Sequence, residues 1–263
     1  MSDQPPSWAA LLSSIAAVLS AMAWPGVAAW FLFSNRIRIA FLLKVLSRKL
    51  SSAKKLKFGQ FELEEELEEA VSEAGAEITD VDTSRTVPEN QVHAAESLKK
   101  KVINSSIPRS EVLEAVRAQI YDLADQYEFV RDHMASGPLR TRRMNEIAAG
   151  MRTLALAALP LRTELTRSKK VGQRLAAICI LQVQPRPRYF RWLIDRVKTE
   201  DQAFVLFQAA VAVLELVKKR LYVNADEARS AINEGIRTIS AFKGGPPDQN
   251  TLDALNEALG LLN

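Results

Sequence analysis

The sequence predicts an all-α protein that begins with a single transmembrane helix and continues, after a small β-hairpin, into a cytoplasmic helical domain. The run from Trp8 to Phe33 has 26 residues and no charge, and a helix needs about 20 apolar residues to cross a bilayer core. Aromatic residues are only 7% of the chain, and alanine and leucine dominate the apolar set, which favours helices over sheets. After Ser110 apolar residues recur every three or four positions, as on one face of a helix.

The charges around the apolar run predict its orientation. The leader from Met1 to Ser7 carries only Asp3, whereas eight basic residues and no acidic residue lie between Arg36 and Lys57. A signal peptide has its basic residues before the apolar run, so cleavage is not expected. Because basic residues stay in the cytoplasm, we predict an inner (plasma) membrane protein with its N-terminus outside and its C-terminal domain cytoplasmic. Residues 1–35 are the predicted anchor.

Two features of this N-terminal part suggest contacts of their own. Small residues four apart would let a neighbouring helix approach closely, although a single-pass helix also uses small residues without associating. The predicted helix-association residues are Ser13, Ala17 and Ala21. The next segment has one apolar and one basic face, which is typical of a helix on an anionic membrane surface or of a continued anchor. Its predicted membrane-surface residues are Arg36, Arg38, Lys44, Arg48 and Lys49.

Residues 36–76 are predicted to end in a hairpin and an acidic helix. A two-residue turn at Gly59-Gln60 would place Phe58 opposite Phe61; a loop that starts the next helix is the other interpretation. Eight glutamates and two aspartates, with no basic residue, lie between Phe58 and Asp82. Residues 77–109 are then polar enough to predict a linker, interrupted by a short helix near Val92 to Val102.

Residues 110–263 are predicted to form a helical domain, which in part resembles a HEAT-type repeat. The resemblance covers about residues 170–217 and rests on Arg174-Leu175-Ala176-Ala177-Ile178, Tyr189-Phe190 with Trp192-Leu193-Ile194-Asp195, and Ala209-Ala210-Val211-Ala212-Val213-Leu214. It implies stacked helices with a binding surface and brings no catalytic residues. The layout of anchor, basic flank, linker and helical module is also similar to bacterial membrane-tethered proteins, some of which take part in phage defence.

The sequence contains no recognisable catalytic, metal or cofactor motif. His93, His133 and the single cysteine, Cys179, cannot supply the usual zinc ligand sets. No phosphate-binding glycine loop or GxSxG elbow is present. Cys179 lies in an apolar run, where a thiolate is disfavoured. We therefore predict a protein that is not an enzyme, with no catalytic residue, no bound metal and no cofactor.

A basic stretch supplies the remaining candidate site. Between Arg131 and Lys198 there are fifteen basic and four acidic residues, and clustered guanidinium groups bind phosphates. The partner would be a phosphate-bearing ligand, a nucleic acid or the anionic inner leaflet of the membrane, and the tether favours the membrane. The alternative is solvated charge at helix ends. The predicted anionic-partner patch contains Arg140, Arg142, Arg143, Lys169, Lys170, Arg186 and Arg188.

These features predict a non-enzymatic, membrane-anchored adaptor or sensor. Its cytoplasmic helical domain would bind a partner protein or a second copy of itself, with the membrane as a further partner and with neither nucleic acid nor a small-molecule substrate expected. The alternative is an oligomerising effector that perturbs the membrane in a bacterial defence system. Forced clustering and the toxicity of the expressed chain would separate the two.

Overall fold

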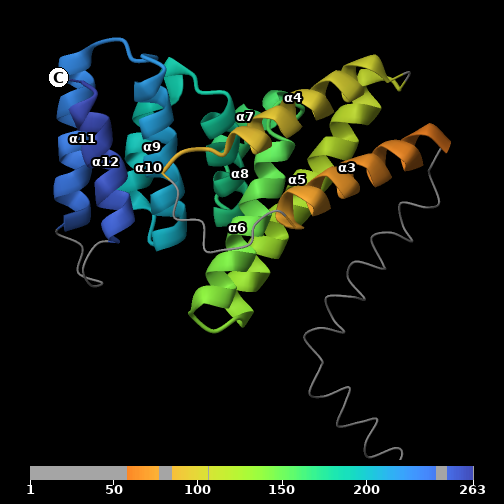
Figure 1. Cartoon of the computed structure of the whole chain (residues 1–263), viewed down its shortest axis with the longest axis horizontal. Coiled ribbons are helices and arrows are strands. Elements are labelled where there is room, and N and C mark those ends of the chain that lie inside the picture. The colour runs from red at the N-terminus through yellow and green to blue at the C-terminus, as the bar shows by residue number, and fades with distance from the viewer. Residues whose placement is uncertain (1–57, 77–84, 106, 241–247, 263) are drawn as a thin grey trace, which may run out of the picture. The chain divides into compact units, whose positions relative to one another are not determined.

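The computed structural model describes residues 58–76, 85–105, 107–240 and 248–262, and every regular element in these ranges is helical (Figure 1). The predicted all-α class is thereby confirmed for this part of the chain. Its helices are α3 (Phe58–Ala76), α4 (Glu89–Asn104), α5 (Arg109–His133), α6 (Pro138–Thr153), α7 (Arg162–Thr166), α8 (Val171–Val183), α9 (Phe190–Thr199), α10 (Ala203–Lys218), α11 (Ala225–Ser240) and α12 (Gln249–Gly260), with 3-10 turns η1 (Leu159–Leu161) and η2 (Pro187–Tyr189).

Prolines mark where several of these helices begin. Pro88 and Pro108 directly precede α4 and α5, and Pro138 is the first residue of α6. A proline at this place costs little, because the first N–H groups of a helix have no partner within the helix. Gly137 turns the chain between α5 and α6 with a φ of 153°, a conformation that a side chain would disfavour. Local sequence therefore sets the ends of the α5–α6 hairpin.

Successive helices alternate between two rows. The first row contains α6, α8, α10 and α12, and each of them contacts the next. In the second row, α7 lies against α8, α9 lies against α10 and α11, and α11 lies against α12. Stacked helical hairpins bury a continuous core in this way. The specific resemblance to HEAT repeats stays a prediction.

The crossing of α5 and α8 depends on a glycine. Gly172 lies in the first turn of α8, and a Cβ atom added to it would be 2.2 Å from the carbonyl oxygen of Ala124 on α5. Only a residue without a side chain permits so close an approach of two backbones. The Gly172 N–H also donates to Glu128 Oε1 at 3.2 Å. Together these contacts fix the N-terminal end of α8 against α5.

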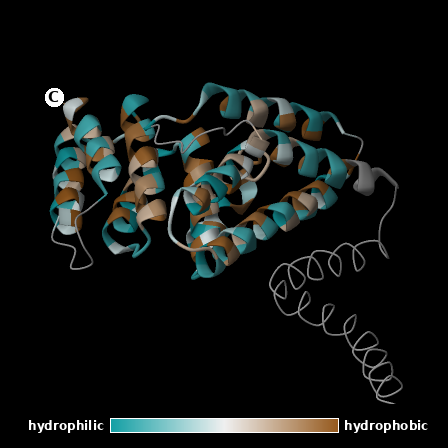
Figure 2. Cartoon of the chain, turned by 60° about the horizontal axis from the view of Figure 1, so that its bottom comes forward, coloured by the Kyte–Doolittle hydropathy of each residue, from teal (hydrophilic) through white to brown (hydrophobic). Residues whose placement is uncertain are grey.

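Helices α3 and α4 share the core of the later helices. Leu63 and Leu67 of α3 and Ala95 and Leu98 of α4 are at most 3% exposed and belong to the same apolar cluster as α5 to α12. Figure 2 shows helices that carry hydrophobic and hydrophilic residues on different sides. The segment expected to be a linker, residues 77–109, thus contains a core helix that is longer than the one expected there.

The predicted β-hairpin at Gly59-Gln60 is wrong. Helix α3 already begins at Phe58, so the residues expected to form the turn and its second strand are helical. An isolated two-stranded hairpin is marginal in water. A helix instead satisfies its own backbone hydrogen bonds and buries Leu63 and Leu67 against the core. The chain enters α3 directly.

The predicted single-pass membrane fold is the second correction. In the ranges that the structure describes, no helix has both the length and the hydropathy needed to cross a bilayer. The longest, α5, has charged residues along its 25 positions, and the apolar α10 has only 16. The predicted span from Trp8 to Phe33 lies outside the described residues. The inner-membrane localisation and the membrane-perturbing alternative concern that span and stay predictions.

Candidate functional site

The structure divides the predicted anionic-partner patch among three places. Its members lie near the start of α6 (Arg140, Arg142, Arg143), directly before α8 (Lys169, Lys170) and directly after α8 (Arg186, Arg188). Helix α8 has 13 residues, or about 20 Å at 1.5 Å per residue. The second and third groups therefore lie at opposite ends of one helix, too far apart for one small ligand.

Several members of the patch are already paired. Arg142 Nε and Arg143 Nη1 donate to the carboxylate of Glu146 at 3.2 and 2.7 Å, and Lys170 Nζ lies 3.5 Å from Asp125 Oδ1. Exposed ion pairs of this kind contribute little to stability, but they reduce the charge available to a partner. The interaction potential of the patch therefore rests on its other members.

The predicted membrane-surface and helix-association residues lie outside the described residues. They are Arg36, Arg38, Lys44, Arg48 and Lys49 in the first set and Ser13, Ala17 and Ala21 in the second. Their roles stay predictions.

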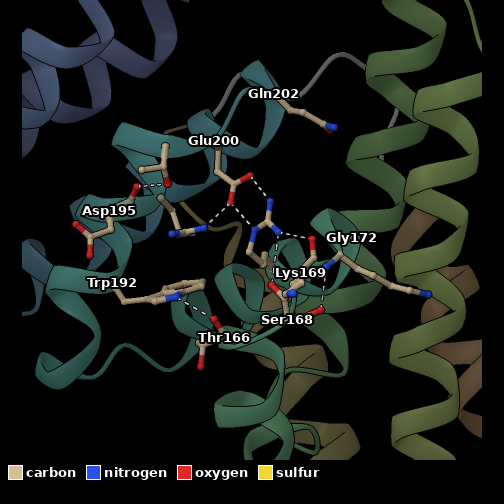
Figure 3. Close-up of polar contacts among 12 residues, drawn as sticks. Thr166, Ser168, Lys169, Gly172, Trp192, Asp195, Glu200 and Gln202 are labelled. Carbon is tan, nitrogen blue, oxygen red and sulfur yellow. Dashed lines mark hydrogen bonds and ion pairs between the residues drawn. The ribbon is translucent and has the colours of Figure 1, made fainter.

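An arginine-rich surface forms around one tyrosine, where α7 meets the segment that follows α8. Trp192 on α9 donates its indole N–H to the carbonyl of Thr166 at 3.1 Å, which holds α9 against the end of α7 (Figure 3). This packing brings a residue of α7 beside the segment before α9. We call the resulting group the Tyr189 surface; it consists of Arg162, Arg186, Arg188 and Tyr189.

Two guanidinium groups of the Tyr189 surface lie over the aromatic ring. The Cζ atoms of Arg162 and Arg188 are 4.9 and 4.8 Å from the centroid of the Tyr189 ring, within the range of cation–π attraction. Arg188 Nη2 also donates to the Tyr189 hydroxyl at 3.1 Å, and Thr163 Oγ1 lies 3.2 Å from it. Burial alone would raise the pKa of Tyr189, but the hydrogen bonds from Thr163 and Arg162 and the charge of Arg162 lower it below its usual value.

The arginines of the Tyr189 surface have no acidic partner in the described part of the chain. Arg162 Nε and Nη1 are buried without a hydrogen-bond acceptor, and Arg186 and Arg188 are exposed. The nearby Arg191, by contrast, is paired with Glu227. Guanidinium groups bind carboxylates in a bidentate manner. The Tyr189 surface is therefore suited to an acidic ligand.

A shallow hollow of about 200 Å³ adjoins this surface. Arg188 and Pro187 line it from one side, and Tyr222 and Val223, which follow α10, line it from the other. The Val223 side chain is 90% exposed, so an apolar contact is available beside the arginines. Aromatic residues, arginine and exposed aliphatic groups together are typical of protein interfaces.

The same chain also presents an acidic surface. Glu65, Glu69 and Glu73 are exposed on α3 and occupy positions four residues apart, so they follow one side of the helix at intervals of about 6 Å. The neighbouring Glu66 is already paired with Lys101 at 2.8 Å. We call the three exposed residues the acidic face of α3.

A second notable group is a charged arginine enclosed by amides. Arg152 on α6 is 5% exposed. Its guanidinium donates to Oε1 of Gln182 (2.7 Å), Gln91 (2.9 Å) and Gln208 (2.7 Å) on three other helices. Gln182 Nε2 in turn donates to Gln208 Oε1 at 2.9 Å. This cage leaves no route for a partner protein, so we assign it to the architecture.

A third polar group ties α8 to the α9–α10 junction (Figure 3). Glu200 is 2% exposed and accepts two hydrogen bonds from Arg174, at 2.6 and 2.7 Å, and one from Arg196 at 3.2 Å. The hydrogen bond to Glu200 raises the pKa of Arg174. Arg174 Nη1 also donates to the carbonyl of Lys169 at 2.7 Å. Two arginines share the one buried carboxylate of Glu200, so the carboxylate has no capacity left for a ligand and we assign the group to the architecture.

The cysteine and the two histidines, which are the candidate metal ligands and nucleophile, lie apart from one another. Cys179 is fully buried, and burial raises the pKa of its thiol to about 11, so it is protonated at neutral pH. His133 stacks on Phe129 with ring centroids 4.4 Å apart, whereas His93 lies 3.9 Å from Glu96 on the exposed side of α4. Within the described ranges, no group of three or more histidine, cysteine, aspartate or glutamate side chains could hold a metal ion.

The fold and its surfaces define an all-α domain of stacked helices with oppositely charged faces. No protein-family model, no curated protein and no solved structure matches the chain. Its function must therefore be argued from the surfaces themselves.

Sequence reasoning found only part of the Tyr189 surface. Arg186 and Arg188 were predicted as members of the anionic-partner patch, whereas Tyr189, which directly follows Arg188, was not. Arg162 could not be linked to them, because only the packing of α7 against α9 brings it there. The same holds for the Arg152 cage, whose members are scattered along the chain.

Proposed function

We propose that the chain is a non-enzymatic helical interaction module that self-associates, with the Tyr189 surface of one copy binding the acidic face of α3 in a second copy. The observation that carries the proposal is the arginine cluster around Tyr189, whose members lack a carboxylate partner in the described residues. Guanidinium groups without a carboxylate partner gain charge-assisted hydrogen bonds when a carboxylate binds.

The acidic face of α3 has the chemistry that the Tyr189 surface requires. Its glutamates recur once per helical turn, so one helix can present several carboxylates to several guanidinium groups in register. The exposed side chain of Val223 at the adjoining hollow adds an apolar contact that pure charge pairing would lack. A pair of charged surfaces also steers encounter and suppresses wrong partners.

The two proposed surfaces differ, so the contact is head-to-tail. Such an interface leaves one surface of each type free at the ends of a dimer, and further copies add until a ring closes or a filament forms. The expected assemblies are therefore larger than dimers at high protein concentration.

Sedimentation velocity of the full-length chain tests this proposal. At low ionic strength, about 50 mM, we expect species larger than a monomer, and at about 1 M salt we expect them to dissociate because screening weakens charged contacts. The variant Arg162→Glu/Arg188→Glu is expected to remain monomeric at low salt. Arg109→Glu is the matched control, since Arg109 is an exposed arginine at the start of α5, and it is expected to assemble normally.

A charge exchange makes the test specific for these two surfaces. Glu69→Arg/Glu73→Arg is expected to remain monomeric alone. When it is mixed with Arg162→Glu/Arg188→Glu, the two variants are expected to assemble in alternation and in equal amounts, because each surface of one variant is then complementary to a surface of the other. A wild-type chain that stays monomeric at every concentration and salt, or mixed variants that fail to pair while each is folded, would refute self-association through these surfaces.

A further inference from the structure

A second hollow, of about 260 Å³, lies where α5, α6, α10 and α12 meet. One part of its wall is aromatic and includes Tyr127, Phe204 and Phe207, and another part contains the arginines Arg131 and Arg140. The hollow is smaller than a typical pocket for a drug-sized ligand. Its volume therefore suits a molecule with one ring and a small head group.

The two arginines that line this hollow have unused hydrogen-bond donors. The Nε atoms of both Arg131 and Arg140 are buried and have no acceptor. The guanidinium of Arg140 makes one long hydrogen bond, from Nη1 to the carbonyl of Met134 at 3.4 Å. Neither arginine forms an ion pair with a described carboxylate. Both side chains are only half-buried, and a guanidinium group without a carboxylate partner gains charge-assisted hydrogen bonds when an anion binds beside it.

The one carboxylate on the wall has another role. Asp248 precedes α12 and accepts hydrogen bonds from the N–H and the hydroxyl of Thr251, at 3.2 and 2.9 Å. Its Oδ2 is thus used in capping the helix, and Asp248 forms no ion pair with Arg131 or Arg140 in the described part of the chain.

The aromatic part of the wall is rigid. Tyr127 has no exposed surface, and its hydroxyl donates to Gln202 Oε1 at 2.9 Å. Its ring lies 5.9 Å from that of Phe204 at an interplanar angle of 31°, and Phe207 is 8% exposed. Tyr127 thus fixes the half-buried ring of Phe204 from behind. A planar apolar group can pack on Phe204 without reordering it, which lowers the entropic cost of binding.

We propose that this hollow binds a small organic anion, with its phosphate or carboxylate head group on Arg131 and Arg140 and its ring against Phe204. This site does not depend on the proposed self-association, because it uses different helices and different residues. Of the predicted anionic-partner patch, only Arg140 belongs to it.

Isothermal titration calorimetry of the full-length chain tests the site with three probes: phenyl phosphate, benzoate and inorganic phosphate. At least one ring-bearing probe is expected to bind with a Kd on the order of 1 mM or below, given the usual affinity per atom of small ligands. Inorganic phosphate is expected to bind more weakly, because it cannot contact the aromatic wall. The tighter of the two ring-bearing probes assigns the head group.

Variants locate the binding in the hollow. Arg131→Ala and Arg140→Ala are each expected to weaken the ring-bearing probe at least about tenfold, since each removes charge-assisted hydrogen bonds. Phe204→Ala is expected to weaken the same probe without changing the affinity for inorganic phosphate. Arg143→Ala is the matched control, because Arg143 lies on the same helix but is paired with Glu146.

Two results would overturn the inference. One is the absence of binding heat for both ring-bearing probes with folded wild-type protein at concentrations well above the expected Kd. The other is an unchanged Kd in both Arg131→Ala and Arg140→Ala. Circular dichroism establishes that each variant is folded, and Arg140→Lys, which keeps the charge but loses the guanidinium fork, is expected to bind with intermediate affinity.

Discussion

Removing one glutamine from the cage around Arg152 is expected to destabilise the protein more than removing the arginine. The guanidinium is buried and held by three neutral amide oxygens, on Gln91, Gln182 and Gln208. Its charge is therefore solvated by dipoles alone, with no carboxylate among its hydrogen-bond partners. Loss of one dipole leaves the charge in place, whereas loss of the arginine removes the charge itself.

The two changes can be compared from the contacts. In Gln208→Leu, Arg152 Nη2 loses a 2.7 Å hydrogen bond, while Gln182 Nε2 keeps the backbone oxygen of residue 208 at 2.8 Å. A hydrogen bond to a charged group is worth about 1.5–3 kcal/mol, and the charge stays buried, so we expect a loss of about 3 kcal/mol. In Arg152→Met two amide oxygens, on Gln91 and Gln182, lose their donors at about 1–3 kcal/mol each. However, this variant no longer buries a charge, which recovers several kcal/mol of desolvation free energy. The net loss in the free energy of unfolding is therefore expected to be about 0–2 kcal/mol.

Urea unfolding followed by circular dichroism at 222 nm measures both changes. A loss of about 3 kcal/mol would be a large part of the stability of a typical domain. Gln249→Leu, at an exposed glutamine at the start of α12, is the control and is expected to stay within about 0.5 kcal/mol of wild type. If Arg152→Met costs more than Gln208→Leu, the reasoning about the uncompensated charge is refuted.

Three further predictions concern the close helix crossing, the cysteine and the tyrosine. Gly172→Ala is expected to lower the free energy of unfolding by about 3 kcal/mol or more, since its Cβ would be 2.2 Å from a backbone oxygen of α5; Gly260→Ala, where the added Cβ would have no neighbour within 4 Å, is the control in urea unfolding. Cys179, whose pKa burial raises to about 11, is expected to resist a disulfide reagent at pH about 8 until urea unfolds the chain; rapid reaction of the folded protein would contradict its burial. Tyr189 is expected to ionise below the pH of an exposed tyrosine when absorbance is followed at 295 nm. Because its folded pKa lies below the unfolded one, the stability it adds is present above pH of about 10 and is lost as the pH falls through the folded pKa; a midpoint equal to that of the unfolded chain would contradict it.

Periodicity predicted the helical class of the region after Ser110 and much of its core, although the apolar repeat from Met144 to Leu165 is divided between α6, η1 and α7. Val116, Ile120, Leu123 and Tyr127 recur at helical spacing, and all four are at most 2% exposed in the structure. The prediction of a hairpin was wrong because apolar residues on either side of Gly59-Gln60 also suit the first turn of a helix. A pattern of so few residues cannot separate the two, and only packing of the following residues on the core decides between them.

Sites built across helices could not be predicted in the same way. Arg152 reaches partners that are 30, 56 and 61 positions away in the sequence, and neither charge nor spacing connects them. The hollow beside Tyr127 combines residues of α5, α6, α10 and α12. A single sequence shows which residues can bind an anion, but tertiary packing decides which of them meet.

The Arg152 cage also bears on how the helices find their alignment. Alanine- and leucine-rich helices such as α8 and α10 present similar surfaces one turn apart, so apolar packing alone distinguishes poorly between one register and the next. Arg152, Gln182, Gln208 and Gln91 can all be satisfied only when α6, α8, α10 and α4 are in one alignment. If one of these helices shifted along its neighbours by one turn, about 5.4 Å, the guanidinium of Arg152 would stay buried without its amide acceptors. The cage therefore disfavours misaligned packing of these helices. This effect on specificity does not require the cage to add to the stability of the native alignment.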